Sequence, residues 1–171
     1  MKDIKDILDI EEKYKKLLME KLNSDKRLSL SCPGFKYPEP VFVYVKAVKT
    51  EKSIAVRIDG GDRTMRFWDY VDDDYSDEDG VWESMTPEGL NKLVAKIYKV
   101  MDKAIDIELY DIDGECVDYF SGVANFEFTA ENACKAVKKI GKGGGFALAK
   151  FSNFYGDVQY VFDKNFKQIK K

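Results

Sequence analysis

Carboxylates are the side chains of this sequence whose number and spacing could do chemistry. Between residues 58 and 83 there are ten acids and two arginines, a net charge of −8. Between residues 104 and 120 there are six acids and no base, a net charge of −6. Clustered carboxylates bind divalent cations through oxygen, and they also attract basic macromolecules. The two acidic segments are therefore candidates for a metal centre or for a protein-binding surface.

The acidic segments do not match the calcium loop of an EF-hand. That loop needs acids at its first, third and fifth positions, glycine at the sixth and glutamate at the twelfth. With Gly80 or Gly114 in the sixth position, no acid occupies the first or the twelfth. A looser Mg²⁺ or Ca²⁺ site is the alternative hypothesis. It would use Asp106, Glu108 and Asp118 as ligands in a metal-dependent nuclease or hydrolase.

Histidine is absent from the sequence. This excludes Ser-His-Asp and Cys-His catalysis and imidazole metal ligands. We expect no catalytic residue, no metal and no cofactor. The glycine-rich run 141–145 does not match a phosphate-binding loop. Such loops follow a strand and begin a helix, whereas this run follows a predicted helix and precedes a predicted strand. A flexible connection is the better interpretation.

Aromatic residues alternate with the acids of the first segment, which is typical of a surface that binds a protein. Tyrosine and tryptophan are common hot spots of interfaces, and surrounding acids steer a basic partner toward them. A solvated loop whose flanking tryptophans belong to the core is the competing interpretation, and for each tryptophan alone it is the one we favour. The candidate partner-binding residues of both segments are Trp68, Asp69, Tyr70, Asp72, Asp73, Asp74, Tyr75, Asp77, Glu78, Asp79, Trp82, Asp106, Glu108, Asp111, Asp113 and Asp118.

The second acidic segment predicts a hairpin with two possible registers. A two-residue turn at 113–114 would place Leu109 opposite Asp118. A three-residue loop at 112–114, with Gly114 in the left-handed conformation, would place Leu109 opposite Val117 and Glu108 opposite Asp118. We prefer the second register because it separates an apolar face from an acidic one. The facing acids would then be compensated by nearby lysines and water, or by an external cation or basic partner.

The functional hypothesis is a non-enzymatic protein-binding module or inhibitor. Its acidic, aromatic surface would occupy a basic surface of a partner, such as the nucleic-acid groove of a nuclease or a toxin. It would thereby act as a partial nucleic-acid mimic, as immunity and anti-defence proteins do. We expect no direct binding of nucleic acid, because the isoelectric point is near 5.2 and the aromatics of the lysine-rich end fit a core.

The elements that position these residues predict an α+β fold. Apolar residues at helical spacing indicate an amphipathic N-terminal helix, and later segments predict an antiparallel meander followed by two helix-plus-hairpin units. We expect one domain over 1–171, with residues 1–24 as the N-terminal helix and 164–171 as a basic tail. The expected elements are a helix at 3–23, strands at 41–45, 54–58 and 64–70, a helix from Thr86-Pro87, the hairpin at 105–120, a strand at 124–128, a helix capped by Thr129, and a hairpin at 146–151 and 158–162.

Composition and targeting signals indicate a cytoplasmic protein. The 171 residues are 44% hydrophobic, enough for a core, and the longest apolar run, 41–45, is too short to span a membrane. Residues 1–6 show no apolar leader, so we expect no secretion and no membrane partner. Three widely spaced cysteines predict reduced thiols.

Overall fold

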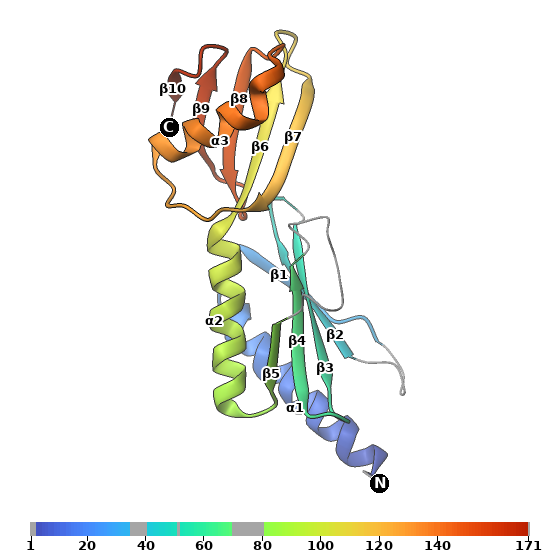
Figure 1. Cartoon of the computed structure of the whole chain (residues 1–171). Coiled ribbons are helices and arrows are strands. Elements are labelled where there is room, and N and C mark those ends of the chain that lie inside the picture. The colour runs from blue at the N-terminus through green and yellow to red at the C-terminus, as the bar shows by residue number, and fades with distance from the viewer. Residues whose placement is uncertain (1–2, 35–40, 51, 70–80, 171) are drawn as a thin grey trace. The chain divides into compact units, whose positions relative to one another are not determined.

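The computed structural model describes residues 3–34, 41–50, 52–69 and 81–170 (Figure 1). It has an α+β fold, as the sequence predicts, and it divides into two compact units, Met1–Val100 and Met101–Lys171. Each unit contains one five-stranded antiparallel sheet. The expectation of a single domain stays a prediction. Within the described ranges, no helix is long and apolar enough to cross a membrane.

The first unit is a meander with the strand order β1-β2-β3-β4-β5. Helix α1 packs on β1, β2 and β3. The central strand β3 has the most buried face, with Ile54, Val56 and Ile58 inaccessible to solvent. The elements of this unit are α1 (Ile4–Asn23), β1 (Leu28–Ser31), β2 (Val41–Ala47), β3 (Ser53–Asp59), β4 (Thr64–Asp69), β5 (Val81–Ser84) and α2 (Pro87–Lys103), the last of which runs through the boundary into the second unit.

Close backbone contact fixes α1 against the β3–β4 turn. The amide of Gly60 donates a hydrogen bond to the buried carboxylate of Glu11 at 3.0 Å. A Cβ atom at Gly60 would lie 2.5 Å from the carbonyl oxygen of Ile7, so only glycine allows the helix to approach this far. Burial raises the pKa of Glu11, while the hydrogen bond from Gly60 opposes that rise.

The second unit has the strand order β10-β9-β8-β6-β7, with α3 packed on β8 and β9 (Figure 1). Its core lies between α3 and one face of the sheet and includes Ile107, Val137 and Phe151. The predicted N-terminal cap of α3 is confirmed, because Thr129 Oγ1 accepts a hydrogen bond from the amide of Asn132 at 3.2 Å. The elements are β6 (Ala104–Tyr110), β7 (Cys116–Val123), α3 (Ala130–Ile140), the short 3-10 helix η1 (Gly141–Gly143), β8 (Leu148–Asn153), β9 (Val158–Asp163) and β10 (Gln168–Lys170).

Several short elements differ from the prediction. Residues 124–128 form no strand; Phe126 and Phe128 instead pack from a loop against the core. The expected basic tail contains strand β10, which pairs with β9. Strands β1 and β5 were not predicted.

Candidate protein-binding site

Half of the candidate residues belong to a segment that lies outside the described residues. Trp68 and Asp69 end strand β4, and the structure describes only their backbone. Trp82 lies on β5 and is 50% exposed, with the guanidinium carbon of Arg66 4.4 Å from its ring centre. The expectation that Trp82 belongs to the core is therefore wrong. The residues outside the described ranges are Tyr70, Asp72, Asp73, Asp74, Tyr75, Asp77, Glu78 and Asp79.

Two acids near the ends of the first acidic segment are partly neutralised within the first unit. Glu83 forms an ion pair with Lys96 of α2. Asp59 lies 3.4 Å from Arg57 and also accepts from the amide of Asp62 at 3.0 Å. These carboxylates therefore have structural partners.

The predicted loop of the β6–β7 hairpin is confirmed, but the register beyond it is wrong. The amide of Asp111 donates to the carbonyl of Glu115 at 2.9 Å, and Gly114 has a φ of +83°, so the loop has three residues with glycine in the left-handed position. Tyr110 then pairs with Cys116. The next pair, however, joins Leu109 to Asp118.

The difference is a β-bulge at Val117, which has no partner residue on β6. One extra residue moves every later side chain of β7 to the other face of the sheet, because side chains alternate with a period of two. Glu108 consequently pairs with Tyr119, and Asp118 shares the α3 side of the sheet with Leu109. The predicted facing pair of Glu108 and Asp118 does not form.

This register separates the three acids of the alternative metal site. Asp106 and Glu108 lie on the face away from α3, and Asp118 lies on the opposite face. In the parts of the chain that the structure describes, no group of three or more potential ligands could hold a metal ion. Asp106, Glu108 and Asp118 are thus not arranged to bind one cation.

On the face away from α3, the acids contact hydroxyl groups. Asp106 accepts a hydrogen bond from Ser121, and Glu108 accepts one from Tyr110 Oη at 2.6 Å. The bond to Glu108 is the main reason that the pKa of Tyr110 rises to about 12. Lys150, which pairs with Glu108 on β8, places its ammonium 5.0 Å from the Tyr110 ring centre. Lys150 thus lies beside Glu108 without an ion pair to it, and compensation of the hairpin acids by lysine stays a prediction.

The hairpin tip combines a structural acid with exposed ones. Asp111 Oδ1 accepts from the amides of Asp113 and Glu115, both at 2.9 Å, and so holds the loop together. The side chains of Asp113, Glu115 and Asp118 are exposed. Among the described residues, no lysine or arginine lies within ion-pairing distance of these three.

Strand β7 is the edge of its sheet in the described chain and exposes apolar side chains on both faces. Tyr119 is 66% exposed. The amide of Ala124 donates to the carbonyl of Lys103, so by alternation the backbone groups of Tyr119 and Ser121 point away from β6. The carboxylate of Asp118 accepts from the outward amide of Tyr119 at 2.9 Å. The exposed large apolar residues of the hairpin are Ile112, Val117, Tyr119, Phe120 and Val123.

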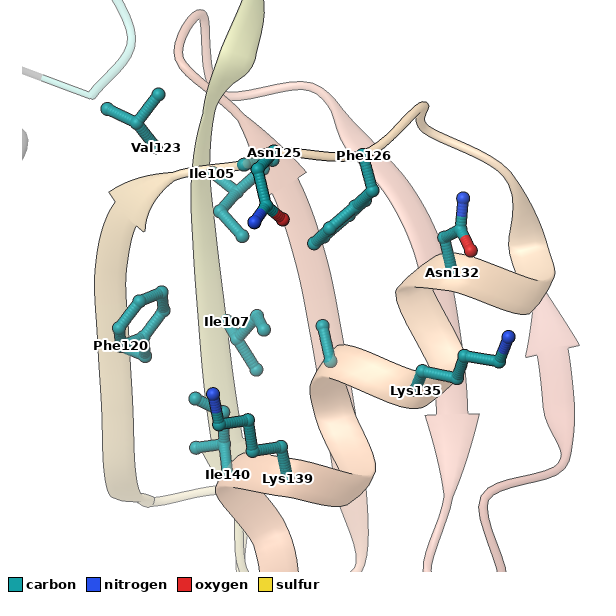
Figure 2. A pocket seen from close by; sticks show the side chains of 12 residues that line it. Ile105, Ile107, Phe120, Val123, Asn125, Phe126, Asn132, Lys135, Lys139 and Ile140 are labelled. Atoms are coloured by element: carbon teal, nitrogen blue, oxygen red, sulfur yellow. The ribbon is translucent and has the colours of Figure 1, made fainter.

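A groove of about 450 Å³ lies between β7 and α3 (Figure 2). Its apolar wall includes Phe120 and Ile107 on the strands and Ile140 on α3, and Lys135 and Lys139 border it on the helix side (Figure 2). The ring of Phe120 lies over Gly122, where an added Cβ would come within 2.7 Å of it. The groove thus continues the exposed apolar surface of β7 toward the helix.

Sequence patterns predicted the acids of this site but not its apolar part. The alternation of Val117 with Tyr119 favoured a regular ladder in which both would face inward, and the bulge instead leaves both exposed. One sequence signal could have predicted an exposed aromatic residue here, namely Phe120 directly after Tyr119. Consecutive side chains of a regular strand face opposite sides, so one of the two aromatics must face outward. Comparison with protein-family models, with curated proteins and with solved structures finds no match for this chain.

Proposed function

We propose that this protein is a non-enzymatic protein-binding module or inhibitor whose contact surface is the β6–β7 hairpin. The observation that carries the proposal is the concentration of exposed apolar side chains on one edge strand. Five of the eleven exposed large hydrophobic residues in the described chain lie between Ile112 and Val123. Single exposed apolar residues are ordinary, whereas several gathered on one edge strand and its loop favour an interaction surface.

The charge around this apolar group favours a basic partner. The hairpin segment 104–120 carries six acids and no base. Asp113, Glu115 and Asp118 border the exposed side chains and lack ion-pair partners in the described part of the chain. Tyr119 would supply the aromatic anchor, and the carboxylates would speed the encounter and select against acidic proteins.

The class of partner that we propose is a protein with a basic functional surface, such as a nuclease groove or a toxin. Occupying that surface with carboxylates would block its access to phosphate, by analogy with immunity and anti-defence proteins. We place the interaction in the cytoplasm, which is supported by three free cysteines, Cys32, Cys116 and Cys134.

The test is capture of proteins from a cell lysate on the immobilised full chain, at about 50 mM and about 500 mM salt. Screening of charge–charge interactions differs strongly between these two salt concentrations. A variant with Val117→Ser and Tyr119→Ser removes two exposed apolar groups of β7. Its matched control, Val158→Ser with Ile169→Ser, removes two exposed apolar groups from β9 and β10 of the same unit.

We expect the unmodified protein and the control to retain a basic protein at low salt and to release it at high salt. Loss of hot-spot side chains should weaken binding of the β7 variant by about 30-fold or more. Retention that is equal for both variants, that salt does not change, or that selects acidic proteins would refute the proposal.

A further inference from the structure

A second cavity of the Met101–Lys171 unit, about 550 Å³ in volume, is lined by positive charge. It lies where α3 and η1 end and the β9–β10 turn begins. Three lysines from separate elements line it: Lys138 from α3, Lys142 from η1 and Lys164 from the turn. No acid is among its lining residues. Within the described ranges, none of the three ammonium groups lies within ion-pairing distance of a carboxylate.

The glycine-rich run forms one wall of this cavity and leaves its backbone accessible. Gly144 has φ +69° and ψ −162°, a region that essentially only glycine adopts, and Gly145 has a φ of +83°. No atom lies within 4 Å of the place where a Cβ would stand at Gly143, Gly144 or Gly145. The amide of Gly144 already donates to the carbonyl of Gly141 at 3.0 Å, but a small anion can approach the loop without displacing a side chain.

The lining of the cavity also contains an aromatic residue with a strained backbone conformation. Three five-residue turns of this unit have the same two hydrogen bonds. The amide of the first residue donates to the carbonyl of the fifth, and the amide of the fourth residue donates to the carbonyl of the first. The fourth residue is Gly114 in one turn and Gly156 in another, both with positive φ. In the β9–β10 turn the same position is Phe166, with a φ of +62°.

A side chain in this left-handed conformation is costly, and such strain is typical of functional sites. The ring of Phe166 packs edge-on against Phe146 at 5.7 Å between centroids. The ammonium of Lys138 stands 5.8 Å from its centroid. The strained backbone conformation of Phe166 therefore occurs where its ring forms part of the cavity wall beside Lys138.

The charge balance indicates the class of ligand. The C-terminal end of α3 contributes about half a negative charge, which three ammonium groups exceed several-fold. One phosphate ester carries about −1.5 to −2 at neutral pH, which leaves part of the lysine charge uncompensated. Two linked phosphates would neutralise it. We propose that this cavity binds a ligand that bears a diphosphate group, independently of the protein-binding hairpin.

The experiment follows the amide resonances of Gly143, Gly144 and Gly145 in the full chain during titration with pyrophosphate. A parallel titration with sodium chloride at matched ionic strength controls for screening. A third titration uses ADP, which separates recognition of the diphosphate alone from recognition of an attached nucleoside. Equal affinities for pyrophosphate and ADP would show that the cavity recognises the diphosphate alone. Tighter binding of ADP would show that the aromatic wall also contacts the nucleoside.

We expect saturable shifts with pyrophosphate, and about tenfold weaker binding for Lys142→Ala and for Lys164→Ala, since each loses one charge-assisted contact. All three lysines are exposed, so these variants should keep the resonance pattern of the unmodified fold. The control is Lys135→Ala, which removes a lysine of α3 that lies beside the other groove and pairs with Glu131 at 3.4 Å. Shifts that sodium chloride reproduces, no saturable shift, or an equal loss in Lys135→Ala would overturn the proposal.

Discussion

Replacement of Asp25 by asparagine should destabilise the first unit in a pH-dependent manner. The carboxylate of Asp25 follows α1 and is only 13% exposed. It accepts hydrogen bonds from Arg27 Nε at 3.0 Å and Arg27 Nη2 at 2.8 Å, and from Tyr98 Oη of α2 at 3.0 Å. Asp25 thus joins the turn after α1 to α2, and Asp25→Asn removes the charge while it keeps the shape.

The magnitude follows from the pKa of Asp25. The hydrogen bonds from Arg27, followed by those from its amide and from Tyr98, lower this pKa from 3.8 to about 2 against the opposing effect of burial. At about 1.36 kcal/mol per pH unit, that difference sets an upper limit of about 2.5 kcal/mol on the stabilisation. Because Arg27 is half exposed, water weakens the interaction, and we expect Asp25→Asn to lose about 1–2 kcal/mol at pH 7.

The sign of the pH dependence is fixed by the direction of this shift. A carboxylate whose pKa is lower in the folded state contributes fully above pH 3.8 and loses its contribution as the pH falls through about 2. The difference between the unmodified protein and Asp25→Asn should therefore shrink from pH 7 to pH 2.

The assay is urea unfolding followed by tryptophan fluorescence, since both tryptophans, Trp68 and Trp82, belong to the Met1–Val100 unit. The control is Asp9→Asn, which removes an exposed acid of α1 and should leave the unfolding free energy unchanged at every pH. Equal stability of Asp25→Asn and the unmodified protein at pH 7, or a difference that persists at pH 2, would show that the hydrogen bonds to Asp25 do not stabilise the fold as described.

Three further predictions concern the second unit. Glu108→Gln should lower the pKa of Tyr110 from about 12 toward the usual 10, which ultraviolet titration of the tyrosines would detect; an unchanged titration would contradict the Glu108–Tyr110 hydrogen bond. Gly144→Ala should cost about 1–3 kcal/mol of stability, measured by calorimetry, because alanine is strained at this backbone conformation; a neutral effect would mean that the loop relaxes freely. Asp118→Ala should increase self-association in sedimentation experiments, because it uncovers the outward amide of Tyr119 at a sheet edge; a purely monomeric variant would oppose this role for Asp118.

Local signals predicted the parts of the fold whose chemistry is local. The hydroxyl of Thr86 accepts from the amide of Gly89 at 2.9 Å at the start of α2, as the Thr-Pro pair indicates. The left-handed backbone conformation at Gly114 was likewise predictable, because glycine is the residue that favours it. By contrast, β1 and β5 have four residues each, too few for alternation to be recognised, and their pairing is set by the neighbouring strands.

The candidate site was predicted only in its composition. The sequence shows where acids cluster but not which face of a sheet they occupy, because a single unpaired residue such as Val117 reverses that assignment. The sequence did not predict the lysine-lined cavity either, and the glycine-rich run 141–145 was interpreted as a flexible connection. Lys142 and Lys164 are more than 20 residues apart, and only the packing of β9 beside β8 and α3 brings them to one cavity.

The bulge at Val117 has a consequence for how this hairpin tolerates change in chain length. Cys116 and Asp118 face consecutive residues of β6, so deletion of Val117 would join the two ladders into one continuous register. Every other cross-strand neighbour would be kept, and the interior would be unaffected. The outline of this exposed edge can therefore vary by one residue while the packed side of the sheet stays constant.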